Sequence, residues 1–264
     1  MARLVIAAAS VATLSISLGG CQTTLSDVTG SIGDKSEASA SADPRRDVQI
    51  YRERYRANPK DPTIAVEYGK ALRATGERAQ AVAVLEQATI ANPGNKAVLA
   101  GYGRALADNG NFQQAYDALS QAHSPEDPDW RILSAQGAVL DQMGRFEEAR
   151  QYYASALKIV PDEPSVLSNL ALSYMLSKDL AKAEEILRRA HAGRETDPRV
   201  RMNLAMVLAL QGRQAEAESV LKADLPPDEA SARVADLKRL MSKKEATSER
   251  GGNRPPDIAK VQTN

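Results

Sequence analysis

The sequence predicts an all-α protein, a right-handed α-α superhelix built from repeated pairs of helices. Three observations support this fold class. Small residues recur at a fixed interval of 34 positions over most of the chain, and self-similarity at such a period is typical of solenoids. Strong helix formers dominate residues 46–245, while only 4% of the chain is aromatic. Glycines also fall at regular intervals between apolar stretches, where turns between helices are expected.

The 34-residue period is kept in four registers without an insertion. Alanine or glycine in the first register lets two helix axes approach closely, and the large residues of the third register fill the space beside the crossing. The registers are Gly69, Gly103, Gly137, Ala171 and Ala205; Ala81, Ala115, Ala149, Ala183 and Ala217; Leu85, Leu119, Tyr153, Leu187 and Leu221; and Ala88, Ala122, Ala156 and Ala190, with Asp224 in the fifth copy.

Glycine is expected to end the first helix of four copies, because a left-handed C-cap requires no Cβ. The fourth copy has Lys178 at this place, which we interpret as drift within a repeat that still packs. Pro93 and Pro161 are expected to stop the second helix of their copies. The turn glycines are Gly76, Gly110, Gly144 and Gly212.

These registers resemble the tetratricopeptide repeat, and the resemblance covers residues 62–226, or five repeats. A half-repeat helix is expected ahead of them at 46–61, and a capping helix after them at 227–245. The capping helix would bury one face, formed by Ala230, Val234, Leu237 and Met241. Twelve helices are expected in all, followed by a disordered tail at 246–264.

The N-terminus indicates export. Residues 4–18 form an apolar run behind Arg3, and 15 residues are fewer than the roughly 20 that a bilayer-spanning helix needs. The run ends in Leu-Gly-Gly before Cys21, which resembles the lipobox of bacterial lipoproteins. That resemblance implies a signal peptide at 1–20 and lipid attachment at Cys21. The alternative is an ordinary secretory signal followed by an incidental cysteine.

The segment at 21–45 is rich in Ser, Thr, Gly, Ala and Asp, so it is predicted to be a disordered tether. A flexible chain of about 25 residues reaches on the order of 25–30 Å. Gln22 follows the cysteine, and by the lipoprotein resemblance a residue other than Asp favours the outer membrane. The expected localisation is therefore the periplasmic face of the outer membrane, with a lipid anchor.

In tetratricopeptide solenoids the first helix of each repeat lines the concave face, which implies a partner-binding groove. The groove is predicted to be basic and polar in repeats one to three and apolar in repeats four and five. An apolar helix or extended segment of a partner protein would dock there, with its acidic residues meeting the arginines. The alternative is that curvature, or the C-terminal helix folding back, buries the apolar part within the chain. The groove residues are Lys70, Arg73, Arg104, Arg131 and Asp141, then Leu172, Met175, Leu176, Met202, Met206 and Leu210.

Residue types required for catalysis or metal binding are scarce. A single cysteine excludes an internal disulfide, and His123 and His191 lie too far apart in sequence to suggest a metal cluster. Basic and acidic residues number 34 each, so the net charge shows no bias toward nucleic acid. No Gly-rich phosphate loop or nucleophile elbow is present. We therefore predict a non-enzymatic protein without cofactor, metal or nucleic acid.

The order of lipobox, polar tether and five repeats resembles the tight-adherence (Flp, type IVb) pilus assembly lipoproteins of the TadD kind. The resemblance implies a periplasmic adaptor that helps place or assemble the pilus secretin. Two alternatives remain open. One is a related lipoprotein adaptor, such as a type IV pilus pilotin or an outer-membrane assembly component. The other is a regulator of cell-wall enzymes.

Overall fold

The computed structural model describes residues 44–192, 197–237 and 239. Within this part the chain forms twelve helices and no strand, which confirms the expected all-α class. Cys21 and the predicted signal peptide and tail lie outside the described residues. The helices are α2 (Pro44–Ala57), α3 (Pro62–Ala74), α4 (Arg78–Ala91), α5 (Lys96–Asp108), α6 (Phe112–Gln121), α7 (Trp130–Gln142), α8 (Phe146–Ile159), α9 (Pro164–Leu176), α10 (Leu180–His191), α11 (Pro198–Leu210), α12 (Gln214–Leu221) and a helix over 227–237, here called the C-terminal helix.

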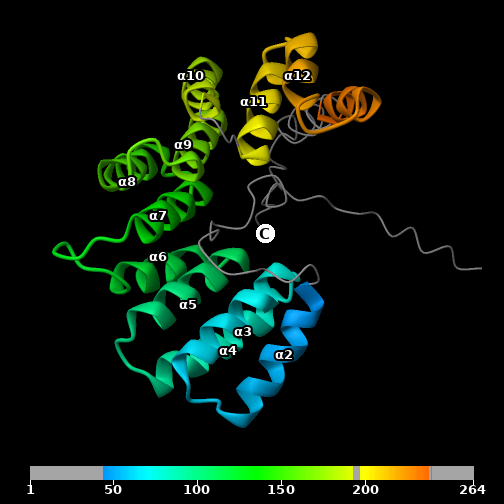
Figure 1. Cartoon of the computed structure of the whole chain (residues 1–264). Helices are drawn as coiled ribbons and strands as arrows, with labels where there is room; N and C mark the ends of the chain where they lie inside the picture. The colour runs from blue at the N-terminus through cyan, green and yellow to red at the C-terminus, as the bar shows by residue number, and fades with distance from the viewer. Residues whose placement is uncertain (1–43, 193–196, 238, 240–264) are drawn as a thin grey trace, which may run out of the picture.

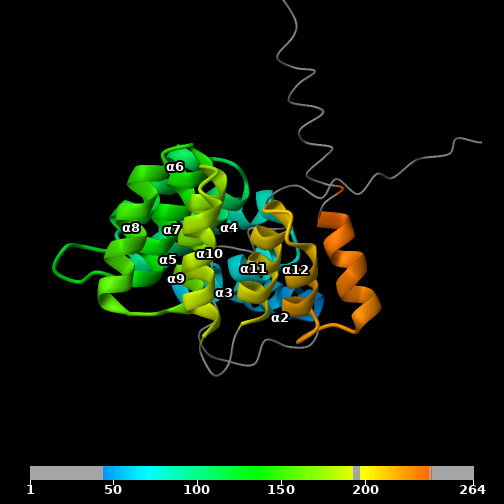
Figure 2. The same cartoon turned by 90° about the horizontal axis from the view of Figure 1, so that it is seen from above.

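The helices follow one another around an arc from α2 to the C-terminal helix, as in a right-handed superhelix of five repeats (Figures 1 and 2). Each helix packs against the next one along the chain. The first helices of the repeats, α3, α5, α7, α9 and α11, also contact one another in series. We call these five the inner helices, because their mutual contacts form one continuous layer. None of the described helices combines the length and the apolarity that crossing a bilayer requires.

Each inner helix begins at an acidic or amide side chain that caps it. Asp61 illustrates the geometry, because one of its carboxylate oxygens accepts hydrogen bonds from the backbone N–H of Thr63 at 2.9 Å and of Ile64 at 3.0 Å. Such a cap satisfies N–H groups that have no partner within the helix. The capping residues form a fifth register at the 34-residue period, which the sequence analysis missed. They are Asp61, Asn95, Asp129, Glu163 and Asp197.

The turn after each inner helix has the left-handed backbone that the glycines predicted. Gly144 has φ of 75°, and the other three turn glycines have similar values. Lys178 holds the same conformation, with φ of 66°, although it carries a side chain. The fourth repeat therefore keeps the turn geometry with a residue that is not suited to it.

Close crossings within the repeats explain the small residues of the first register. A Cβ at Gly137 would lie 2.7 Å from Cε1 of Tyr153, and one at Gly69 would lie 2.5 Å from Cδ1 of Leu85. In the fourth and fifth repeats the corresponding residues, Ala171 and Ala205, are fully buried. The register thus marks the contact between the two helices of a repeat.

The C-terminal helix closes the stack. Its Ala230 and Val234 are buried in the same apolar cluster as Ala217 and Leu221 of α12. Figure 1 shows this helix beside α12, at the end of the arc. It therefore has the position of the predicted cap, and Met241 of the expected apolar face lies outside the described residues.

Candidate protein-binding face

The predicted basic residues all belong to inner helices, but their side chains differ in accessibility. Arg73 on α3 donates from Nε to a carboxylate oxygen of Asp108 on α5, at 2.6 Å, and its side chain is only 7% exposed. Arg104 on α5 is also only 7% exposed. Lys70 is half-buried. Of the predicted cations in the first two repeats, Arg73 is thus engaged by the next repeat and Arg104 is buried.

Arg131 is the first inner-helix cation of the third repeat. Its guanidinium lies 4.5 Å from the ring centroid of Trp130, in the geometry of a cation–π contact. Both side chains are half-buried at the start of α7. No partner is present in the structure, so the contacts predicted for Lys70, Arg73, Arg104 and Arg131 with a partner stay predictions.

Asp141 is a buried carboxylate that connects three helices. It accepts hydrogen bonds from the Tyr153 hydroxyl of α8 at 2.8 Å and from the Ser173 hydroxyl of α9 at 2.6 Å. Burial raises its pKa to about 6, although these two hydrogen bonds and the charge of Arg150 act in the opposite direction. Asp141 therefore joins the third repeat to the fourth, and its pKa lies well above the ordinary value of a carboxyl group.

Serine–asparagine pairs connect the inner helices further along the stack. Asn169 donates to the Ser134 hydroxyl at 3.1 Å, and Asn203 donates to the Ser168 hydroxyl at 2.6 Å. Each pair spans 35 residues and therefore joins adjacent repeats. The sequence analysis missed these links, although the repetition of both serine and asparagine at 34 positions could have revealed them. They hold α7, α9 and α11 in register.

The predicted apolar residues lie on α9 and α11, and all six are half-buried. Met175 and Met202 pack against the large buried cluster of the last two repeats. The other four belong to no buried cluster in the described part of the chain and are not packed against one. We call these four the apolar inner patch: Leu172 and Leu176 on α9, and Met206 and Leu210 on α11.

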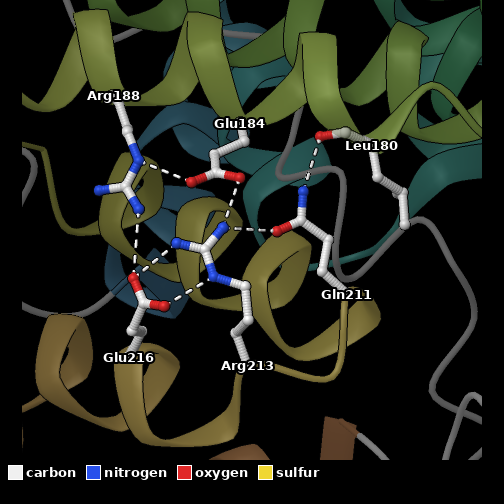
Figure 3. Close-up of polar contacts among 6 residues, drawn as sticks. All are labelled: Leu180, Glu184, Arg188, Gln211, Arg213 and Glu216. Atoms are coloured by element: carbon white, nitrogen blue, oxygen red, sulfur yellow. Dashed lines mark hydrogen bonds and ion pairs between the residues drawn. The ribbon is translucent and has the colours of Figure 1, made fainter.

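A network of ion pairs connects the two repeats that carry the apolar inner patch (Figure 3). Arg213, at the start of α12, donates to Glu184 of α10 at 2.7 Å and to both carboxylate oxygens of Glu216 at 2.6 Å. Arg188 of α10 donates to Glu184 at 2.7 Å. Gln211 donates to the Leu180 carbonyl at 3.3 Å. The network fixes the turn between α11 and α12 against α10.

The charges in this network stabilise the ionised carboxylates. The hydrogen bonds from Arg213 lower the pKa of Glu216. Burial alone would raise the pKa of Glu184, but hydrogen bonds from Arg188 and Arg213 outweigh it, so that this pKa is lowered as well. Both carboxylates therefore stabilise the folded state at pH values above their ordinary pKa. This contribution to stability is lost as the pH falls through the lowered pKa values.

The described residues contain no group of three His, Cys, Asp or Glu side chains arranged to hold a metal ion. The Nε2 atom of His123 lies 3.0 Å from the side-chain oxygen of Gln136, within hydrogen-bond distance. His191 is the last residue of α10. Both imidazoles are half-buried.

Comparison with solved structures identifies proteins with the same fold. The chain is 18% identical to PilW, a widely conserved type IV pilus biogenesis factor, with a TM-score of 0.61 over 73% of this chain and 91% of that one. It is 18% identical to pilF of Pseudomonas aeruginosa, with a TM-score of 0.53 over 73% of this chain and 90% of that one. For the APC/C hetero-tetramer Cut9–Hcn1 the identity is 15% and the TM-score 0.60, over 77% of this chain and 40% of that one. At these identities the likeness concerns the fold.

A search of curated proteins returned no match. A family model, the cilia and flagella-associated protein 70 C-terminal domain, matches residues 19–237. This model describes tetratricopeptide repeats and indicates no catalytic family. The match covers well over half of the chain and all five repeats. The chain therefore belongs to the tetratricopeptide-repeat family of the cilia and flagella-associated protein 70 C-terminal domain.

Proposed function

We propose that the protein is a non-enzymatic scaffold that binds a partner protein at the inner face of its last two repeats. The apolar inner patch is the observation that carries this proposal. Leu172, Leu176, Met206 and Leu210 are half-buried and are not packed against the buried clusters of the described chain. Apolar side chains on adjacent helices suit an apolar partner helix or extended segment, and methionine can adapt to its shape.

The more specific proposal is a periplasmic adaptor attached to the outer membrane through lipid on Cys21, with a role in placing or assembling the secretin of a tight-adherence pilus. The apolar run at 4–18 and the small residues before Cys21 support the anchor. The order of lipobox, tether and repeats supports the pilus role. PilW, which has the same fold, is itself a type IV pilus biogenesis factor.

The likeness to PilW also favours a second candidate, a lipoprotein adaptor of type IV pilus assembly. The two candidates differ in the client that enters the same inner face. Secretin genes next to genes for a tight-adherence pilus ATPase would favour the first candidate, whereas a type IV pilus cluster would favour the second. Neighbouring genes for murein enzymes would favour the regulator of cell-wall enzymes.

Crosslinking from the inner face tests the scaffold function. A photo-crosslinking residue at Met206 should capture one envelope protein in intact cells. The same residue at Ser219, which is exposed on α12, is the matched control and should not capture it. Introducing a charge beside the probe, with Leu210→Glu, should abolish capture while the far-ultraviolet circular dichroism stays the same. Equal capture from both positions, or none from Met206, would contradict the proposal.

A further inference from the structure

The first described helix, α2, has a strongly basic outer surface. Val48 is buried against the first repeat, and Tyr51 and Tyr55 are packed on the same cluster. At 100° per residue, these three residues define one side of the helix, so the remaining sides face away from the stack. The exposed charged residues of α2 and the turn after it are Arg45, Arg46, Arg54, Arg56 and Lys60, with Glu53 as the exposed acidic residue.

Folding does not account for all of these cations. Arg52, on the packed side, donates to the Tyr68 hydroxyl at 3.3 Å and so has a structural role. Arg46 and Arg56 form no ion pair with any residue of the described chain. In the later repeats, by contrast, Arg188 and Arg213 are held by carboxylates. Arg46 and Arg56 are thus exposed cations that no ion pair within the described residues engages, although Glu53 lies on the same side of α2.

The place of α2 in the chain indicates what the basic face meets. Twenty-two residues separate Cys21 from Pro44, where α2 begins. A random coil of 22 residues would have a root-mean-square end-to-end distance of roughly 23–28 Å. If Cys21 is acylated, as the proposed function requires, α2 is the first described element beyond the bilayer anchor.

We propose that the basic face of α2, centred on Arg46 and Arg56, docks on the anionic phospholipid headgroups of the membrane that holds the anchor. This inference rests on the proposed lipid anchor. Guanidinium groups suit phosphate, because their planar N–H groups donate two parallel hydrogen bonds. Docking orients the solenoid with its first repeat at the membrane, and the later repeats with the apolar inner patch follow around the arc (Figure 1).

Vesicle binding tests this surface without help from the anchor. The chain from position 21 onward, with Cys21→Ser, retains every described residue and the segment between Cys21 and α2 but no acyl chain. It should co-sediment with phosphatidylglycerol vesicles and not with phosphatidylcholine vesicles. Added salt should weaken the binding, because exposed charges are screened.

Two double variants locate the binding face. Arg46→Gln with Arg56→Gln should weaken partitioning about 30-fold, since each cation near an anionic surface contributes about 1 kcal/mol and 1.4 kcal/mol is a factor of ten. Lys158→Gln with Arg233→Gln removes the same charge from two other exposed positions, and it should retain most of the binding. Circular dichroism should be the same for all three proteins.

Three results would overturn the proposal. The first is no binding to phosphatidylglycerol vesicles, and the second is an equal loss in both double variants. The third is self-association that depends on Arg46 and Arg56 without vesicle binding, which would identify a second copy as the partner. None of these results affects the proposed function, because acylation of Cys21 and capture from Met206 are measured separately.

Discussion

Gly137 faces a side chain that has little freedom to move. A Cβ at this position would lie 2.7 Å from the Tyr153 ring, whose hydroxyl is held by Asp141. We expect Gly137→Ala to lower the free energy of unfolding by about 1–3 kcal/mol, the usual cost of overpacking. Urea denaturation measures this change.

Gly69→Ala is the matched control for that substitution. Its Cβ would meet the flexible side chain of Leu85 instead of a ring, and the alanine–leucine combination already occurs as Ala171 with Leu187, both fully buried. The loss at Gly69 should therefore be clearly smaller. Equal losses at the two positions would show that the ring and its hydrogen bond are unimportant.

Asp141 should make stability depend on pH. Its pKa is about 6 in the folded protein against an ordinary value of 3.8, so the folded state binds the proton more tightly than the unfolded state. The contribution of Asp141 to the free energy of unfolding is fully present at pH values below 3.8. It is lost as the pH rises through about 6, and the loss amounts to roughly 2–3 kcal/mol.

Asp141→Asn should remove this loss. The asparagine side chain stays neutral and can keep hydrogen bonds to Tyr153 and Ser173. The free energy of unfolding is measured at pH 4 and at pH 7.5 for both proteins. Its decrease from pH 4 to pH 7.5 should be smaller in the variant than in the parent protein. All other carboxylates are the same in the two proteins, so the difference reports on Asp141. Parallel pH profiles would argue against a raised pKa at Asp141.

At the scale of an element, the turn between α9 and α10 is the least favourable of the five. Lys178 holds φ of 66°, where a Cβ is disfavoured, while its N–H donates to the Met175 carbonyl at 3.0 Å as in a helix cap. Lys178→Gly should therefore raise the free energy of unfolding by about 1 kcal/mol, as measured by urea denaturation.

The reverse exchange provides the check on that prediction. Gly144 has φ of 75° in the equivalent turn, so Gly144→Lys should destabilise the protein by a similar amount. If both variants lost stability, the exposed Lys178 side chain would have a stabilising role of its own.

At the scale of the whole molecule, the anchor determines where the scaffold works. Cys21→Ser in the full chain should abolish incorporation of radiolabelled palmitate and, after a high-salt wash that screens binding through exposed charges, shift the protein from the outer-membrane fraction to a soluble fraction. The far-ultraviolet circular dichroism should not change, because all described helices begin after residue 43. Absence of palmitate label from the unsubstituted chain would exclude the lipid anchor.

The helices, their turns and their pairing were predictable because they depend on local features. A small residue at each crossing and a glycine after four of the five inner helices act within about 16 residues, and the repeated copies of the pattern reinforce one another. The capping register from Asp61 to Asp197 is equally local. It could have been found from the same period.

Accessibility on the inner face depended instead on contacts between repeats. Arg73 is engaged by Asp108 from the next inner helix, Arg104 is buried, and Met175 and Met202 pack against the last cluster. Each of these outcomes requires a neighbour from another repeat at a specific distance. The sequence alone therefore determined the class of fold and its repeat unit, because these follow from interactions within one helix pair. Only the tertiary structure decided which inner-face side chains remain available, because the stacking of adjacent pairs controls their burial.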